Sequence, residues 1–223
     1  PDVTRALAPL AGDAERMGNN LVDFLKNEVK HGRLPENLLP LQSGVGNVAN
    51  AVINGLVHSD FKNLSVYTEV IQDGMFDLID EGKIDMISGT SLSPSPDGLK
   101  RFYANIEKYS KKIILRPQEI SNNGEGARRI GVVAMNTALE MDIYGHVNST
   151  HVTGTKLMNG IGGSGDFARN GALSCFFCHS VAKGGAISAV VPMCSHVDHT
   201  EHDTHVFISE QGVADVRGLS PKE

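Results

Sequence analysis

The stretch 64–88 limits the folds open to this chain more than any other part of the sequence. Residues 64–70 carry the β-branched, aromatic and apolar side chains typical of a strand. Apolar residues then recur at helical spacing over 75–79, Gly82 is suited to end that helix, and 84–88 again has strand character. The pattern predicts a β-α-β unit, and such units build parallel sheets.

Glu69 lies at the carboxyl end of the first of these strands. In open parallel sheets, ligands bind at this edge. From the local pattern alone, a solvated carboxylate at the end of a strand is the simpler interpretation of Glu69. Features elsewhere in the chain favour a functional role instead.

Strands and helices alternate along most of the chain. We expect helices over 13–30, 48–56, 75–79, 97–106 (capped by Asp97) and 167–173, and strands over 38–41, 64–70, 84–88, 113–115, 132–140, 144–152, 174–182, 186–193 and 205–210. This alternation predicts an α/β fold with a largely parallel open sheet flanked by helices. A chain of 223 residues can bury the core of one large domain of this class, or of two small ones.

The composition argues against several classes of partner. The net charge is −6, and no basic stripe with interleaved aromatic residues is present, so we expect no nucleic-acid partner. No apolar run approaches the roughly 20 residues of a spanning helix and no signal peptide is visible, so we expect no membrane partner. Three cysteines fit a reducing compartment better than a disulfide framework. We expect the protein to be cytoplasmic, or mitochondrial if it comes from a eukaryote.

Both ends of the sequence resemble cut points. Pro1 stands where an initiator methionine would be expected. Ser220, Pro221 and Glu223 have the spacing of a helix start, with no helix body after them. We therefore expect this chain to be part of a longer protein.

Two glycine-rich turns each precede a predicted helix. They are 42–47 (Gln-Ser-Gly-Val-Gly-Asn) and 159–166 (Asn-Gly-Ile-Gly-Gly-Ser-Gly-Asp). Glycines before a helix let a ligand approach main-chain N–H groups closely. The first turn lacks both the third glycine of a dinucleotide fingerprint and the lysine of a P-loop, so a plain strand-to-helix turn stays open for it.

Two other motifs suggest different chemistry. Cys175, Cys178 and His179 have the spacing of a c-type haem attachment site, or of a redox cysteine pair without the helix that should follow it. The run 194–205 holds imidazoles and carboxylates that could bind Zn²⁺, but as one local cluster without a distant ligand pair. A polar loop with hydrogen-bonded histidines is the favoured interpretation of that run. A metal- or haem-binding module is the alternative from another class of protein.

Nearly the whole chain resembles the carboxyl-terminal half of class I coenzyme A transferases, in the acetyl-CoA hydrolase and succinyl-CoA:acetate CoA-transferase branch. The resemblance is carried by seven blocks in the same order: 41–47, 67–73, 116–122, 159–166, 183–185, 196–203 and 209–212. It implies that 1–223 is a CoA-transferase catalytic domain with a NagB/RpiA-like fold. The cysteines are not part of the family pattern, and Gly124 stands where proline is expected.

The resemblance also implies roles for individual residues. Glu69 would be the covalent nucleophile, with Asn122 and Glu210 beside it, and the amides of Val45 and Gly163 would stabilise the oxyanion. Coenzyme A would be bound by Gly44, Val45, Gly46, Asn47, Val48, Asn159, Gly163 and Lys183. The implied partners are the missing amino-terminal half of the same protein and a second copy in a homodimer.

The implied activity is a CoA-transferase that moves coenzyme A between acetyl- or succinyl-CoA and a small carboxylate through a glutamyl-CoA thioester. Acyl-CoA would then be a substrate, with no metal and no tightly bound cofactor. The alternative is an acetyl-CoA hydrolase that uses the same glutamate. The two differ in whether water reaches one pocket, and the sequence leaves both open.

Overall fold

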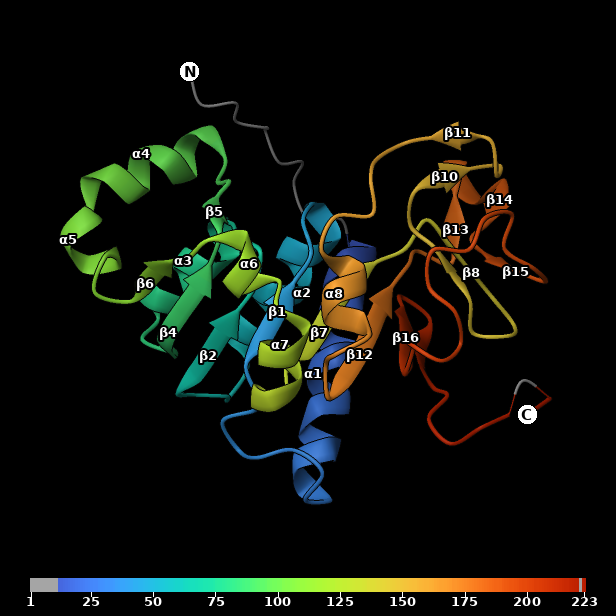
Figure 1. Ribbon diagram of the computed structural model, residues 1–223, viewed down its shortest axis with the longest axis horizontal. Helices are drawn as coiled ribbons and strands as arrows, with labels where there is room; N and C mark the ends of the chain where they lie inside the picture. Colours follow the sequence, from blue (N-terminus) through green and yellow to red (C-terminus); the bar gives the residue numbers. More distant parts are fainter. Residues whose placement is uncertain (1–11, 221) are drawn as a thin grey trace.

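The computed structural model describes residues 12–220 and 222–223 (Figure 1). The helix start predicted at 220–223 includes Pro221, which lies outside the described residues. Within the described residues, no helix is long and apolar enough to cross a membrane.

A largely parallel sheet forms the centre of the fold, which confirms the predicted fold class (Figure 1). Among the described residues it has eight strands, in the order β17-β16-β12-β7-β1-β2-β4-β6, and only β16 and β17 run antiparallel. In chain order these strands are β1 (Leu41–Ser43), β2 (Leu64–Tyr67), β4 (Ile84–Gly89), β6 (Ile113–Leu115), β7 (Val133–Thr137), β12 (Leu173–Phe177), β16 (Val206–Ser209) and β17 (Gly212–Asp215).

The strand order reverses direction between β1 and β7. From β1 the chain builds outward through β2, β4 and β6, and it then returns to β7 on the other side of β1 and builds outward through β12 and β16. The connections at the carboxyl ends of β1 and β7 therefore leave in opposite directions. Such a reversal opens a crevice where ligands bind in α/β sheets.

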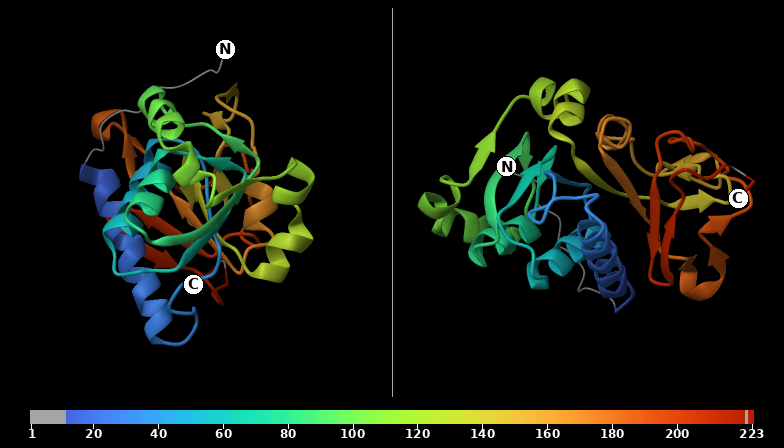
Figure 2. Two further views of the ribbon diagram at one scale, coloured as in Figure 1. Left: turned by 90° about the vertical axis from the view of Figure 1, so that its left-hand side faces the viewer. Right: turned by 90° about the horizontal axis from the view of Figure 1, so that it is seen from below.

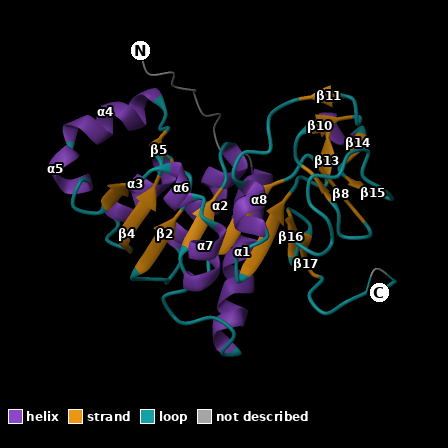
Figure 3. Cartoon of the chain, viewed as in Figure 1, coloured by secondary structure: helices purple, strands orange, loops and turns teal. Residues whose placement is uncertain are grey.

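Helices cover both faces of the sheet, as Figures 2 and 3 show. They are α1 (Gly12–Lys30), α2 (Asn47–His58), α3 (Asp73–Asp80), α4 (Pro96–Ala104), α5 (Ile106–Tyr109), α6 (Gln118–Ser121), α7 (Gly124–Ile130) and α8 (Ser164–Ala168). On β7, Val133 and Met135 join the core beneath α1, α2 and α3, whereas Ala134 joins a smaller core with Ala127 of α7 and Phe167 of α8. Alternate residues of one strand thus face the two helical layers.

A region of short strands follows β7. It contains β8 (Glu140–Asp142), β9 (Val147–Asn148), β10 (His151–Val152), β11 (Lys156–Leu157), β13 (Val181–Ala182), β14 (Ile187–Ser188) and β15 (Val190–Val191). The predicted strands 132–140, 144–152 and 186–193 are therefore too long. The buried carboxylate of Asp142 explains part of this, because it accepts the amides of Tyr144 at 3.0 Å and His146 at 2.9 Å and folds the chain into a turn.

Several predicted boundaries are wrong for local reasons. Leu38 has a φ of 56°, so the first strand starts only at Leu41. The α4 helix is capped by Ser95, whose Oγ accepts the Gly98 amide at 3.0 Å, and not by Asp97. The helix expected over 167–173 is α8, which starts earlier, at Ser164, and ends at Ala168. The strand expected over 174–182 is β12, which covers only Leu173–Phe177.

A further pair of short parallel strands is formed by β3 (Val70–Ile71) and β5 (Ser91–Leu92).

A buried carboxylate joins the end of α1 to the edge strand β17. Glu28 is 1% exposed and accepts from Arg33 Nε at 3.0 Å and from Arg217 Nη1 at 2.9 Å. Arg217 also donates to Asp215 at 2.6 Å. The hydrogen bond from Arg33, followed by that from Arg217, lowers the pKa of Glu28 below its ordinary value.

Replacing Arg217 by alanine should lower the free energy of unfolding by about 2 kcal/mol at pH 7, because a buried carboxylate loses a charged partner. Arg129→Ala is the control, because its ion pair with Glu125 is exposed and should contribute little. The stability that Glu28 provides is fully present above its ordinary pKa of 4.5 and is lost as the pH falls through the lowered value. Urea denaturation of both variants at neutral and acidic pH measures this. If Arg217→Ala and Arg129→Ala lost equal free energies of unfolding at pH 7, the stabilising role of the Arg217–Glu28 contact would be contradicted.

Candidate active site

The main chain around Glu69 is fixed on both sides. The buried Thr68 donates its hydroxyl to the Ser43 carbonyl at 3.1 Å, which joins the ends of β2 and β1. The carbonyl of Glu69 itself accepts the amide of Thr90 at 2.8 Å. The backbone of Glu69 is therefore held by its neighbouring strands, and its side chain projects beyond the carboxyl edge of the sheet, as the sequence predicted.

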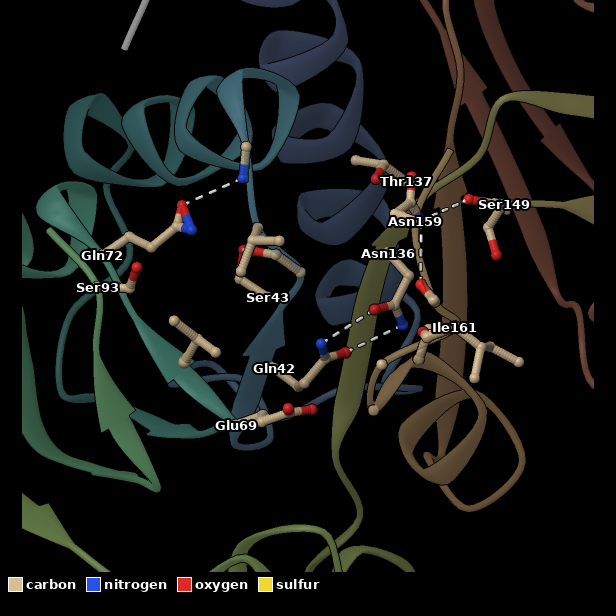
Figure 4. Close-up of a pocket in the computed structure, with 18 of the residues that line it drawn as sticks. Gln42, Ser43, Glu69, Gln72, Ser93, Asn136, Thr137, Ser149, Asn159 and Ile161 are labelled. Carbon is tan, nitrogen blue, oxygen red and sulfur yellow. Dashed lines mark hydrogen bonds between the residues drawn. The ribbon is translucent and has the colours of Figure 1, made fainter. Parts of the chain in front are cut away.

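A cavity of about 610 Å³ lies at this edge (Figure 4). The two glycine-rich turns line it through 42–46 and 159–164, together with Glu69 and Asn136. It sits where the strand order reverses between β1 and β7. Its size is in the range of small-molecule sites.

Two buried amides form the floor of this cavity. Gln42 Nε2 donates to Asn136 Oδ1 at 3.1 Å, and Asn136 Nδ2 donates back to Gln42 Oε1 at 3.1 Å (Figure 4). Gln42 Oε1 also accepts the Met135 amide at 3.1 Å. The pair adds side-chain hydrogen bonds to the backbone pairing of β1 with β7.

The carboxylate of Glu69 rests against the second glycine turn. Asn122 donates its Nδ2 to Glu69 Oε2 at 3.0 Å. Glu69 Oε2 lies so close to Gly163 that a Cβ on that residue would overlap it, and the same Cβ would also collide with Asn122 Nδ2. The absence of a side chain at position 163 is therefore what lets the turn, Asn122 and Glu69 meet.

Each glycine turn presents an amide to the cavity. In the first turn, Gly44 donates to the Met135 carbonyl at 2.8 Å and Gly46 donates to Gln72 Oε1 at 3.3 Å. The amide of Val45, between them, donates to no acceptor among residues 12–220 and 222–223, and the same holds for Gly163. Both residues line the cavity, so two main-chain donors from different turns are available to a ligand.

The predicted coenzyme A residues divide into two groups. Asn159 lines the cavity and is oriented by its hydrogen bond to the Ser149 carbonyl at 3.0 Å. Asn47 is exposed and Val48 packs against the main core, so neither lines the cavity. Lys183 is exposed, begins the short 3-10 turn η1 (Lys183–Gly185), and also lies outside it.

The expectation that Glu210 lies beside Glu69 is not met. Glu210 follows β16, and β12, β7 and β1 separate that strand from β2. Its carboxylate instead accepts the Ser180 amide at 3.0 Å and the Ser180 hydroxyl. Burial alone would raise the pKa of Glu210, but these hydrogen bonds outweigh it and lower the pKa to about 2.

Sequence reasoning gave no role to three residues that the structure places at the site. Gln42 and Asn136 form the floor, and Asp166 accepts from Asn122 Nδ2 at 3.1 Å. A polar residue within the apolar strand predicted over 132–140 was a usable signal for Asn136, because a buried amide requires a partner. Asp166 carried no comparable signal, because an acidic residue in the first turn of a helix is common.

The two competing motifs do not form sites of their own. Cys175 and Cys178 are both buried, so neither thiol is exposed to a haem, and the same burial raises their pKa to about 12. In the run 194–205, His196 contacts Asp198 at 3.2 Å and His199 contacts Ser164 at 3.1 Å. Across the described ranges, no group of three His, Cys, Asp or Glu side chains is placed to hold a metal ion.

Gly163→Ala should displace Glu69 or the 159–163 turn and reduce the free energy of unfolding by about 1–3 kcal/mol, because the added Cβ overlaps the ends of the Glu69 and Asn122 side chains and something must shift. Gly160→Ala in the same turn is the matched control, since a Cβ there meets nothing within 4 Å. Crystal structures and denaturation curves of both variants measure this. A Gly163→Ala structure in which neither the Glu69 carboxylate nor the 159–163 turn has moved would contradict the contact.

Comparison with known proteins identifies the family of this chain. The family model for the acetyl-CoA hydrolase/transferase C-terminal domain matches residues 98–223. The succinyl-CoA:acetate CoA-transferase of Clostridium kluyveri is 63% identical over 222 residues, which cover 100% of this chain and 41% of that protein. The acetyl-CoA hydrolase of Neurospora crassa is 52% identical over 227 residues, which cover 100% of this chain and 43% of that protein.

A solved structure shares the fold. A mutant of RipA, a protein of Yersinia pestis, superposes with a TM-score of 0.82 at 23% sequence identity, covering 100% of this chain and 50% of that one. The chain spans less than half the length of the Clostridium kluyveri and Neurospora crassa relatives. The seven sequence blocks indicated the correct resemblance, and the chain belongs to the acetyl-CoA hydrolase/transferase family.

Proposed function

We propose that this chain is the part of a CoA-transferase that carries the nucleophile, and that Glu69 forms a thioester with coenzyme A during each turnover. One observation carries the proposal. The Glu69 carboxylate lies against Gly163 in a cavity bounded by two glycine turns, and each turn has a main-chain amide that donates to no acceptor within the described ranges. The likeness to enzymes named for acetyl-CoA and succinyl-CoA supports the same chemistry.

The first step is attack of a Glu69 carboxylate oxygen on the carbonyl carbon of the acyl-CoA thioester. The carbon–sulfur bond breaks, the thiolate of coenzyme A leaves with the electron pair, and an acyl-glutamyl anhydride remains. The thiolate then attacks the side-chain carbonyl carbon of Glu69. The anhydride bond breaks, the first acid leaves as a carboxylate, and Glu69 is a thioester of coenzyme A. A second carboxylate reverses both steps and departs as the new acyl-CoA.

The amides of Val45 and Gly163 have the role of oxyanion donors in this scheme. Each tetrahedral intermediate carries a negative oxygen, and preorganised N–H groups stabilise it without rearrangement. Loss of one such donor typically costs about 3 kcal/mol, or roughly a hundredfold in rate. Asn122 holds Glu69 Oε2 at 3.0 Å and so leaves Oε1 as the attacking atom.

We place the coenzyme A chain along the cavity wall that Gly44, Val45, Gly46, Asn159 and Gly163 form. Lys183, Asn47 and Val48 would contact coenzyme A only where it extends beyond this cavity, and Glu210 has no direct part in the bond changes. Acyl-CoA is a substrate here, and the scheme needs no tightly bound cofactor because carboxylate and thiolate exchange every bond. We further propose that residues 1–223 form one catalytic domain of a cytoplasmic homodimer, and that the rest of the protein completes the pocket.

A hydrolase is the second candidate, because a relative at 52% identity is named acetyl-CoA hydrolase. In that case water instead of an acid would take the acyl or glutamyl group. The full-length enzyme with acetyl-CoA, assayed for free thiol and for succinyl-CoA with and without succinate, distinguishes the two. We expect little free thiol in either case and succinyl-CoA only when succinate is added, because the transferase returns coenzyme A to the acceptor acid and water competes poorly inside an excluded site. Full release without any acceptor acid would establish the hydrolase.

Glu69→Ala should reduce the transfer of coenzyme A by at least about a thousandfold, because it removes the carboxylate that attacks the thioester. Thermal unfolding should stay close to that of the wild-type enzyme, since the Glu69 side chain is only partly buried. Glu81→Ala, at an exposed glutamate that follows α3, is the control and should keep full activity. Turnover by Glu69→Ala at the wild-type rate would reject the assignment.

A further inference from the structure

Two carboxylates share one amide group beside the cavity. Asn122 Nδ2 lies 3.0 Å from Glu69 Oε2 and 3.1 Å from Asp166 Oδ2. An amide nitrogen carries two hydrogens, so each carboxylate receives one of them. Asp166 is therefore linked to Glu69 through Asn122.

This arrangement fixes which way the Asn122 amide faces. Its other end, Oδ1, is buried and has no hydrogen-bond partner in the described part of the chain. A rotated amide would gain nothing there and would turn its oxygen toward two negative carboxylates. The hydrogen bond to Asp166 makes that rotation still less favourable, because Asn122 would lose two charge-assisted hydrogen bonds at once.

Asp166 is itself held in place from the neighbouring helix. Its carbonyl accepts from Asn170 Nδ2 at 2.7 Å, and Asn170 Oδ1 accepts from Arg128 of α7 at 2.5 Å. Gly124 makes room for this contact, because a Cβ there would lie 2.6 Å from Asn170 Nδ2. The glycine found in place of the expected proline therefore belongs to the packing that supports Asp166.

The exposure of Asp166 indicates that it does not serve the core. It lies at the surface, whereas the residues on either side of it in α8, Gly165 and Phe167, are buried. Its described side-chain hydrogen bond is the one from Asn122. Asp166 is thus a surface carboxylate whose described side-chain hydrogen bond comes from Asn122, the residue that also donates to Glu69. It is therefore placed to orient the Asn122 amide.

We propose that Asp166 is a positioning residue for the transfer reaction. By accepting the second N–H of Asn122, it keeps the first directed at Glu69 Oε2, so that Oε1 is aimed at the thioester carbonyl carbon in the first attack. This role rests on the proposed function of Glu69. It assigns to Asp166 an orienting hydrogen bond and no direct contact with the substrate.

A double-mutant cycle in the full-length enzyme tests the proposal. Asp166→Ala should lower kcat for acetyl-CoA with succinate about tenfold, with KM for acetyl-CoA within about twofold, because orientation is lost and binding is kept. In an Asn122→Ala background the same substitution should change kcat by less than about twofold, because its target is absent. Asp166→Asn, which keeps an oxygen acceptor, should retain kcat within about threefold of the wild type.

Asp97→Ala is the matched control, because Asp97 is also an exposed acid in the first turn of a helix and, in the part of the chain that the structure describes, its side chain pairs only with Lys100. It should leave kcat unchanged. Equal effects of Asp166→Ala with and without Asn122 would overturn the proposal, and so would an Asp166→Asn enzyme as slow as Asp166→Ala. If Asp166→Ala does not fold, Asp166→Asn alone tests the proposal, and a kcat about tenfold below that of the wild type would overturn it.

The proposed function is checked separately in the same preparations. Borohydride trapping of wild-type enzyme after acyl-CoA treatment should show a thioester on Glu69. If that thioester is missing, the proposed function fails whatever Asp166 does. If it forms and the cycle shows no coupling, only the role of Asp166 fails.

Discussion

The close approach of a carboxylate to a residue without a side chain is the contact on which this site depends. A Cβ at Gly163 would overlap both Glu69 Oε2 and Asn122 Nδ2, and Asn122 Nδ2 donates a hydrogen bond to Glu69 Oε2. Three chain segments far apart in sequence therefore meet at one point. Their meeting places the Val45 and Gly163 amides on the same cavity as the carboxylate. A negative oxygen that develops there would find donors already in place, which is how protein dipoles stabilise charge most effectively.

The fold makes this contact by reversing its strand order beside the site. β1 and β7 lie next to each other, while their following connections leave in opposite directions. The two strands pair through their backbones, and the Gln42–Asn136 pair adds reciprocal side-chain hydrogen bonds beside the cavity. The helical layers on both faces bury the apolar residues at alternate positions of the strands.

Local pattern predicted the parts of the structure that local interactions determine. The β-α-β unit around Glu69, the parallel sheet and the two glycine turns could be read from strand and helix periodicity and from glycine placement. The region after β7 could not, because Asp142 and residues with positive φ break its apolar runs into strands of two or three residues. The start of α4 was misassigned to Asp97 because Ser95 precedes a proline, and that proline occupies the first helical position.

The sequence could indicate only those residues of the site that belong to a recognisable motif and line the cavity themselves. Glu69, Val45, Asn159 and Gly163 line one cavity, as the resemblance implied. Glu210 failed that expectation, since three strands stand between β16 and β2. Asp166 was missed because its connection to Glu69 runs through the side chain of Asn122, and hydrogen bonds of that kind depend on how α8 packs against α7.

Mass spectrometry of the peptide that contains Glu69, after the full-length enzyme is treated with acyl-CoA and then borohydride, shows whether this glutamate becomes a thioester. We expect the Glu69 side chain to be reduced to a primary alcohol, since only an activated acyl carbon such as a thioester reacts in this way. Reduction at another residue, or an unmodified Glu69 in an enzyme that turns over acyl-CoA, would contradict it.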